Sequence, residues 1–234
     1  MKKYCITILL FATLIGNAQN AFTFGKKYGV MNLDNINRTV YSYNYARTWL
    51  TQKMPYFHYM QGYEGSWQSR GELVGFELVF SRISETNIAF GLEPTSGLMG
   101  YRKIKIGYGG MSGGVTVKVL DTKHLEIVPS LDGDLHFFTA STTYSNDAAF
   151  AGGTEEGVIN NIKLASTLSV NFSFMATSWF GINIRPYYQQ PWGRTNVEGL
   201  AAYWGGSGTG SQRENVQNYG ISASLILEFG RDVD

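Results

Sequence analysis

Apolar and polar residues alternate over long stretches of this sequence, most clearly between Leu164 and Phe174. Apolar side chains hold nearly all of the even positions in this segment, and polar or small side chains hold the odd positions. The same alternation returns between Tyr219 and Phe229. A period of two is typical of a β-strand with one apolar and one polar face. Both segments are therefore predicted to be strands whose apolar face contacts a protein core or lipid.

Alternation and turn residues together predict about eight strands. They lie near residues 38–47, 57–68, 72–82, 99–110, 123–138, 161–174, 179–189 and 216–229. Short turns alternate with three long connections rich in Gly, Ser, Thr and Asn, at 83–98, 139–160 and 190–215. Tight turns at one end and long loops at the other are typical of outer-membrane barrels. We therefore predict an all-β fold, an antiparallel up-and-down transmembrane β-barrel.

The glycine-rich stretch Gly109–Gly114, followed by Val115–Val119, leaves the number of strands open. We interpret it as an extension of the fourth strand that reaches below the membrane and pairs with the start of the fifth. A separate strand here would instead give a ten-stranded barrel. Residues 19–37, which end in a stretch without a usable period, are predicted to be a periplasmic N-terminal arm. The barrel then spans 38–230, and 231–234 form a C-terminal tail.

The first 18 residues have the features of a signal peptide. Lys2 and Lys3 form a positive start, Ile6–Ile15 is an apolar run, and Gly16–Ala18 offers small residues for cleavage. The apolar run is much shorter than the roughly 20 residues that a spanning helix needs. The chain is therefore predicted to be exported, with residues 1–18 removed.

Composition narrows the class of protein further. The only cysteine, Cys5, lies in the predicted leader, so the mature chain has none to form a disulfide. Without Lys2 and Lys3, 17 basic residues stand against 18 acidic ones, and this balance does not indicate a nucleic-acid partner. With 28 glycines, 15 tyrosines and 14 phenylalanines, the chain suits one aromatic, glycine-rich β domain.

Charged residues make up only 16% of the chain, and many of those in strands lie opposite the apolar stripe. A soluble lipocalin-type barrel would instead point its apolar residues inward and carry dense charge outside. We predict that charges of both signs pair inside a narrow barrel, since isolated buried charges would be costly. An eight-stranded interior is about filled by side chains, so such pairs would plug it. The predicted lumen residues are Glu77, Lys103, Lys105, Glu126, Asp132, Asp134, Lys163, Arg185 and Glu228.

Aromatic residues gather near the predicted strand ends, where interfacial girdles would place them. The alternative is that aromatic residues are simply good strand formers. The residues in question are Tyr56, Phe57, Tyr59, Tyr101, Tyr108, Trp179, Phe180, Tyr187, Tyr188, Trp192, Tyr219 and Phe229.

Three segments carry a resemblance to a known family: the leader ending Ile15–Gln19, the hairpin Gly62–Arg82 and the closing strand Tyr219–Phe229. With them the chain resembles small eight-stranded outer-membrane barrels of the OmpA and OmpX type, and more particularly the outer-membrane β-barrel proteins of Bacteroidota. The resemblance is architectural and covers most of the mature chain. It implies residence in the outer membrane of a Gram-negative bacterium, with outer-membrane lipid and other envelope proteins as partners. Such barrels often end on an aromatic residue, whereas here Gly230–Asp234 follows Phe229.

Candidate chemistry is sparse. His124 and His136 share a predicted face with several acids, but roughly 40 Å of strand separates them at 3.3 Å per residue, so they cannot serve one site. Neither a Gly-x-Ser-x-Gly motif nor the His-x-Ser pattern of lipid A deacylases occurs. Asp132-Gly133-Asp134 resembles part of a calcium loop whose other ligands are missing. No catalytic residue, metal site or cofactor is therefore predicted.

The sequence thus predicts a non-enzymatic barrel with a structural, adhesion or complex-accessory role. Its external loops, or the arm at 19–37, would bind the partner, and no small-molecule ligand is identified. A lipid-active enzyme and a narrow small-solute channel are the alternatives. Aromatic and Arg anchors carry much of the energy of an interface. The loop candidates are Trp192, Arg194, Tyr203, Trp204 and Arg213.

Overall fold

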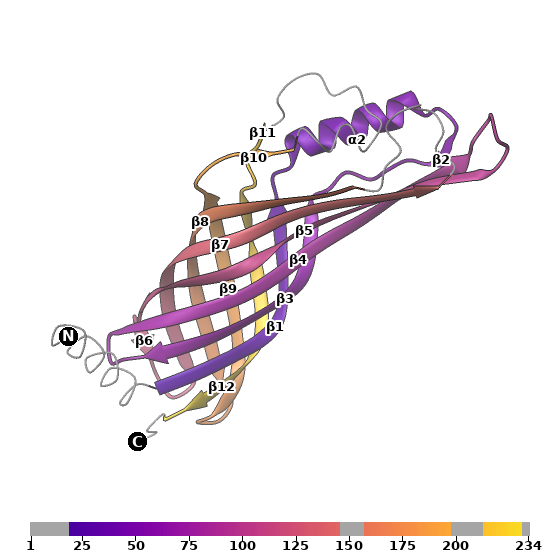
Figure 1. Ribbon diagram of the computed structural model, residues 1–234. Coiled ribbons are helices and arrows are strands. Elements are labelled where there is room, and N and C mark those ends of the chain that lie inside the picture. The colour runs from indigo at the N-terminus through magenta and orange to yellow at the C-terminus, as the bar shows by residue number, and fades with distance from the viewer. Residues whose placement is uncertain (1–18, 146–156, 198–212, 231–234) are drawn as a thin grey trace.

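The computed structural model describes residues 19–145, 157–197 and 213–230, and its main feature is a closed antiparallel barrel of eight strands (Figure 1). These strands are β1 (Gln19–Met31), β3 (Tyr59–Arg70), β4 (Val74–Leu92), β5 (Met99–Val117), β7 (Leu125–Ser145), β8 (Gly157–Met175), β9 (Phe180–Pro191) and β12 (Asn218–Phe229). The barrel closes because β1 pairs with β3 on one side and with the last strand, β12, on the other. The predicted all-β, antiparallel barrel of eight strands is confirmed.

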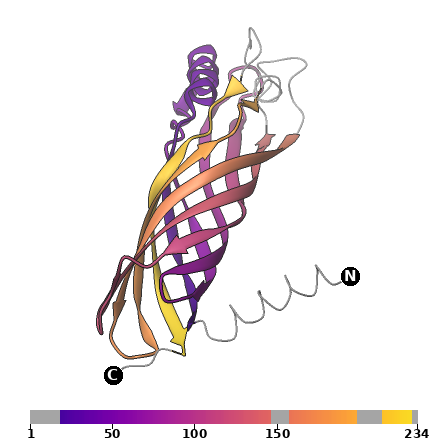
Figure 2. The ribbon, with the colours of Figure 1, turned by 90° about the vertical axis from the view of Figure 1, so that its left-hand side faces the viewer.

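The remaining elements are small. Helix α2 (Asp34–Ala46) lies across one end of the barrel, which we call the helix end (Figures 1 and 2). The other end holds the short turns, the start of β1 and the end of β12, and is called the turn end. Short strands complete the structure: β2 (Leu50–Gln52), β6 (Leu120–Asp121), and the pair β10 (Thr195–Asn196) and β11 (Arg213–Glu214). Within the described ranges, no helix has the length and apolar character needed to cross a membrane.

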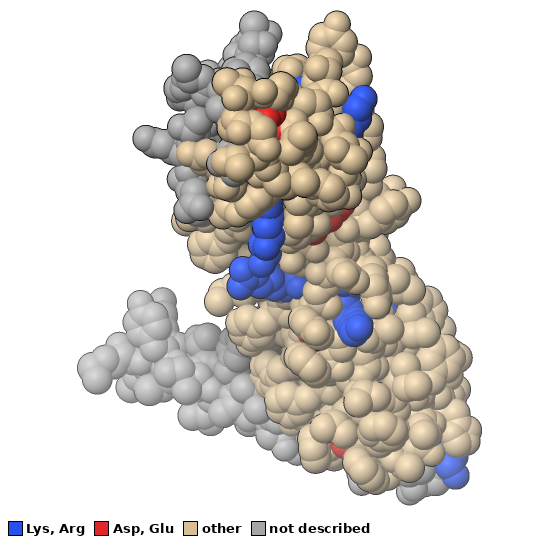
Figure 3. All heavy atoms as spheres, turned by 90° about the vertical axis from the view of Figure 1, so that its right-hand side faces the viewer, with Lys and Arg blue, Asp and Glu red and all other residues tan. Residues whose placement is uncertain are grey.

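The outer surface near the turn end is apolar. Phe24 is 66% exposed, and its partner across the β1–β12 ladder, Leu225, is 56% exposed. Neighbouring residues such as Thr23 and Ser224 point inward and are buried. Figure 3 shows this on one face, where Lys and Arg side chains cross the middle of the molecule and few charges lie below them. Strands that are apolar outside and polar inside are the pattern of a lipid-facing barrel.

Two sequence predictions at the N-terminal side are wrong. Residues 19–31 are not an arm but β1, in which Phe22 and Phe24 face outward while Ala21 and Thr23 face inward. The strand predicted at 38–47 is instead helix α2. The alternating tyrosines of that segment suggested a strand, but the apolar residues at helical spacing decide the structure, because they can pack together on the barrel strands.

The glycine-rich stretch continues β5 to Val117, as predicted, and pairs with both β4 and β7. It does not reach below the apolar surface, because Met111 and Val115 on it face outward and are half exposed. Strands β4, β7 and β8 are also longer than predicted, so that most of the connection predicted at 83–98 is strand. The predicted leader, 1–18, and tail, 231–234, lie outside the described residues.

Candidate functional site

From the turn end to the helix end, the outer face of β5 changes from apolar to polar side chains, and its inner face changes from polar to apolar ones. Near the turn end the outward side chains are apolar, as at Met111, whereas nearer the helix end they are Lys103 and Lys105. Ile104 and Ile106 there point inward and are buried. Strand β7 changes in the same way: Leu131 and Leu135 face outward nearer the turn end, whereas Phe138 and Ala140 face inward and are buried nearer the helix end. Beyond the apolar outer surface, the sheet thus offers its apolar face to the inside.

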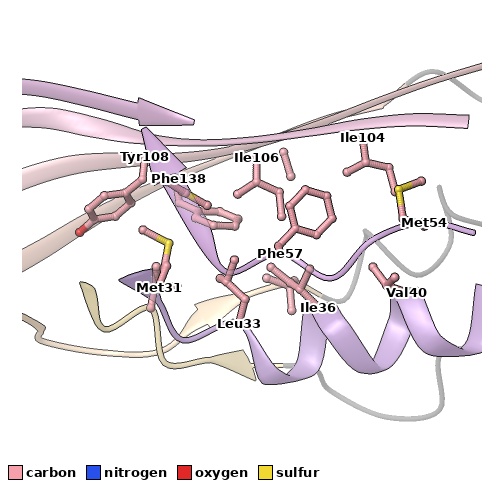
Figure 4. Close-up of a cluster of buried hydrophobic side chains, with 14 of the residues drawn as sticks. Met31, Leu33, Ile36, Val40, Met54, Phe57, Ile104, Ile106, Tyr108 and Phe138 are labelled. Carbon is pink, nitrogen blue, oxygen red and sulfur yellow. The ribbon is translucent and has the colours of Figure 1, made fainter. Parts of the chain in front are cut away.

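Helix α2 covers this inward apolar face, and together with residues 47–58 and the extended parts of β4, β5 and β7 it forms a unit that we call the cap. Figure 4 shows Ile36 and Val40 of α2 directed toward Ile104 and Ile106, with Phe57 between. Full burial of such side chains stabilises by about 1.5–3 kcal/mol each. The cluster comprises Met31, Leu33, Ile36, Val40, Tyr43, Leu50, Met54, Phe57, Met60, Ile83, Ala89, Ile104, Ile106, Tyr108, Phe138, Ala140, Val197 and Val216.

The N-terminus of α2 is capped from a distant part of the chain. Leu33 precedes the helix and supplies no side-chain capping bond. Instead the Glu214 carboxylate accepts hydrogen bonds from the backbone N–H groups of Asn35 and Ile36, at 2.8 and 3.1 Å. Burial raises the pKa of the Glu214 carboxyl above its ordinary value, although these two donors act to lower it. The helix start is therefore fixed to β11.

Two asparagines fasten the other side of α2. Asn37 exchanges a pair of hydrogen bonds with the backbone N–H and C=O of Phe57, at 2.8 and 2.9 Å. Asn44, two turns later, forms the same pair with Met54 at the same two distances. These side chains replace strand partners for the extended segment 53–58 and hold it against the helix. The cap is thus a defined structure rather than a loose connection.

A second core, polar this time, fills the barrel below the cap. Arg185 lies at its centre and is buried, with Nη2 2.9 Å from Glu77 and 2.8 Å from Asp132. Its Nη1 is 3.2 Å from Glu64, which also pairs with Lys27 at 2.6 Å. Several strands contribute to this network, so its ion pairs tie opposite walls of the barrel together.

Further polar groups lie on both sides of this centre. Toward the turn end, Arg70 pairs with Glu126 and lies 3.5 Å from Glu228. Toward the helix end, Gln189 donates to Asp134 at 2.9 Å and lies 3.1 Å from Nδ1 of His136. Polar contacts therefore continue from one end of the lumen to the cap.

Six of the nine predicted lumen residues lie in these networks: Glu77, Glu126, Asp132, Asp134, Arg185 and Glu228. The predicted lumen position of Lys103 and Lys105 is wrong, because at their level the apolar face of β5 is the inner one. Lys163 lies near the helix end, where its ammonium donates to the backbone oxygen of Arg194 rather than to a carboxylate.

The sequence prediction missed the buried charges Lys27, Glu64 and Arg70. Lys27 lies in the segment that was predicted to be an arm. Glu64 does occur in the strand predicted at 57–68, in phase with Ser66 and Gln68, and Arg70 continues the same phase just beyond its predicted end. That polar phase was the signal that could have placed them in the lumen.

Among the predicted loop residues, Trp192, Arg194 and Arg213 are exposed near the helix end. Tyr203 and Trp204 lie outside the described residues.

Two exposed aromatic residues lie outside the loops that the sequence predicts to bind a partner. Tyr41 and Tyr45 are 59% and 76% exposed on the outer side of α2, with their ring centroids 6.3 Å apart. Of the predicted girdle residues, Phe57 and Tyr108 belong instead to the cap cluster, and Tyr187 faces the lumen.

The structure keeps the two histidines of β7 and its preceding turn apart. Nδ1 of His124 lies 3.3 Å from the Met175 backbone oxygen at the turn end, whereas His136 is buried near the cap. In the described part of the chain, no group of three His, Cys, Asp or Glu side chains could hold a metal ion.

Comparison with known proteins bears on the fold. No protein-family model and no curated protein sequence matches the chain. Among solved structures it is similar to Ail, the attachment invasion locus protein of Yersinia pestis, at 10% identity and a TM-score of 0.50, over 91% of this chain and 99% of that one. It is also similar to OprG of Pseudomonas aeruginosa (10% identity, TM-score 0.45) and OmpT protease of Escherichia coli (7%, 0.41), over 91% of this chain and 97% of each of theirs. The chain therefore has the fold of a small outer-membrane β-barrel, closed by eight antiparallel strands.

Proposed function

We propose that this protein is a non-enzymatic outer-membrane barrel that displays its cap outside the cell, where the cap binds a partner. The observation that carries this proposal is the division of the chain into an ion-paired barrel and a cap with its own apolar core. A barrel needs only an apolar outside and a satisfied inside to cross a membrane. The cap adds a preorganised surface, and preorganisation lowers the entropy lost on binding.

The membrane location is supported by the apolar outer surface near the turn end, since exposed apolar areas of this extent are unusual on soluble monomers. The leader-like residues 1–18 and the resemblance to OmpA, OmpX and Bacteroidota barrels support the same location, in the outer membrane of a Gram-negative bacterium. Outer-membrane lipid is then the immediate surrounding of the barrel.

The outer side of α2 is the part of the cap best suited to contact a partner. Tyr41 and Tyr45 stand exposed there, and Arg38 lies on the same side one turn earlier. Tyrosine and arginine are enriched among the residues that dominate binding energy. The exposed Trp192, Arg194 and Arg213 extend this surface at the same end of the barrel.

Orientation can be tested with single cysteines, because the mature chain would have none. Ser42→Cys places a thiol on the exposed side of α2, and Thr177→Cys places one in a turn at the opposite end. We expect a membrane-impermeant maleimide to label S42C on intact cells, and T177C only after lysis. The reverse pattern would place the cap in the periplasm and contradict the proposal.

Partner binding can be tested by purification in mild detergent, followed by mass spectrometry of co-eluting proteins. We expect a stoichiometric envelope partner that is retained by wild type and lost from the double variant Y41S/Y45S, with K123Q at the turn end as the matched control. Steady conductance in planar bilayers would favour a narrow channel instead, and release of fatty acid from lipid would favour a lipid-active enzyme.

A further inference from the structure

The outer wall of the barrel carries a groove of about 740 Å³ that runs across β1, β3, β4, β5 and β7. Its floor is low because Gly65, Gly107 and Gly109 present no side chain on the outer face. Large apolar side chains stand around it, including Phe24 and Phe80, which are 66% and 55% exposed. The groove therefore lies within the apolar outer surface.

Two cations, Lys26 and Arg82, border one side of this groove and lie in one row across neighbouring strands. The strand register places Lys26 opposite Tyr63, Tyr63 opposite Arg82, and Arg82 opposite Gly109. Lys26 and Arg82 are both exposed. Across the described residues, no carboxylate lies within salt-bridge distance of either side chain. Two cations without acidic partners thus flank the ring of Tyr63.

A polar hollow of about 470 Å³ adjoins the groove on the side of the helix end. Lys26 and Tyr63 line it together with Gln61 and Ser84. Glu85 also borders it, but both of its oxygens accept hydrogen bonds, from the N–H of His58 and from Nδ2 of Asn87. An apolar groove therefore leads into a polar hollow, and Lys26 and Arg82 lie where the two meet.

We propose that the groove binds an anionic, phosphate-bearing lipid of the surrounding membrane leaflet, with an acyl chain along the glycine floor and the phosphate at Arg82 and Lys26. A zwitterionic lipid such as phosphatidylcholine fits this site poorly, because its own choline group neutralises its phosphate. Guanidinium and ammonium groups form strong charge-assisted hydrogen bonds with phosphate. Tyr63 contacts both parts of such a lipid, because it lines the groove and the hollow alike. This inference rests on the membrane location in the proposed function, but not on a protein partner.

Binding can be measured by native mass spectrometry of the purified protein in detergent, titrated with lipid A or with phosphatidylcholine. We expect one equivalent of lipid A to bind saturably and at least tenfold more tightly than phosphatidylcholine. The double variant K26Q/R82Q removes the charges and keeps the groove, and we expect it to weaken lipid A binding at least tenfold. The matched control, K123Q, removes a cation at the turn end and should bind as wild type does.

The apolar part needs a variant of its own. Gly65→Leu fills the groove, and a Cβ at this position meets only ordinary contacts, 3.5 Å from the Thr23 backbone oxygen and 3.7 Å from Phe24. Gly133→Leu, at an open outward position that does not line the groove, is its control. We expect G65L to weaken lipid A binding at least tenfold and G133L to leave it unchanged.

Equal binding of the two lipids, or lipid A binding that survives K26Q/R82Q or G65L, would overturn the lipid site. These outcomes are independent of the proposed function, because neither the labelling of S42C nor the loss of a partner in Y41S/Y45S depends on the groove. A barrel labelled from outside that binds no lipid A would therefore refute this inference alone.

Discussion

The two halves of β5 place opposite chemistry on the same faces. Near the turn end Met111 faces outward and Ser112 faces inward, whereas in the cap Lys105 faces outward and Ile104 inward. The difference follows from the surroundings of the two halves. The half nearer the turn end, or lower half, has an apolar exterior and a lumen of ion pairs. The half nearer the helix end, or upper half, has a polar exterior and a helix that covers its inner face. Period-two alternation therefore identifies a strand along its whole length, but it does not say which face is inside.

The largest expected effect concerns the lumen of the lower half. Arg185→Ala leaves Glu64, Glu77 and Asp132 with Lys27 as the remaining cation of the central network. Removing one partner of a buried ion pair typically costs about 3–5 kcal/mol. Urea unfolding in lipid vesicles, followed by tryptophan fluorescence, should show a loss of this size. The double variant R185A/E77Q should recover part of it, and a loss below about 1 kcal/mol would show that the ion pairs do not hold the barrel.

A lysine exchange tests the outer faces of the two halves directly. Leu225→Lys introduces a charge on the apolar outer surface, which costs about 2–4 kcal/mol near the middle of a bilayer. Lys105→Leu, on the polar exterior of the upper half, should change the unfolding free energy by less than about 0.5 kcal/mol. The same urea experiment measures both. Equal costs for the two variants would mean that the halves do not differ in their surroundings.

The apolar core of the cap can be weakened separately. Ile36→Ala removes a fully buried side chain between α2 and the sheet, and we expect a cost toward the lower end of about 2–5 kcal/mol. Because the cap has its own core, hydrogen exchange should lose protection in α2 while the barrel amides near Leu225 keep theirs. Ser42→Ala, on the exposed side of the helix, is the control. Uniform loss of protection would show that the cap and the barrel unfold as one unit.

The smallest effect is the pH dependence of the cap. A carboxyl whose folded pKa is raised contributes stability that is complete below its ordinary value of 4.5 and is lost as pH rises through the folded pKa. Protection of the first α2 amides should therefore fall from pH 4 to pH 7, after correction for intrinsic exchange. Glu214→Gln stays neutral and should remove this fall, whereas Glu72→Gln at an exposed turn should not. An unchanged slope in E214Q would exclude Glu214 as its source.

Much of the barrel could be predicted from the sequence because its strands follow one rule along the apolar outer surface: apolar side chains face outward and polar side chains face the lumen. Leu164–Phe174 and Tyr219–Phe229 are strands, and Arg185, Asp132 and Glu77 meet in the lumen as the polar phase indicated. The same rule failed for Lys103 and Lys105, since the phase of β5 changes where the cap begins. Placing them required knowledge that a helix covers the inner face there.

The helix itself was missed because two signals overlapped in one segment. Tyr41, Tyr43 and Tyr45 alternate as in a strand, while Ile36 and Val40 together with Tyr43 repeat at helical spacing. β-Branched and aromatic residues lower helix propensity, so the local preference favoured the wrong structure. Packing on the sheet decides in favour of the helix. A second clue, Asn37 and Asn44 two helical turns apart, becomes meaningful only once segment 53–58 lies beside them.

The capping of α2 by Glu214 also sets the order in which this molecule can be assembled. Glu214 follows Asn35 by 179 residues, and the ladder between β1 and β12 joins Asn20 to Phe229. Contacts between such distant residues form slowly, because a long loop must close first. Until the C-terminal strand arrives, β1 keeps an open edge and α2 keeps two unbonded N–H groups. Closure of the barrel and completion of the cap are thus late events that depend on the same end of the chain.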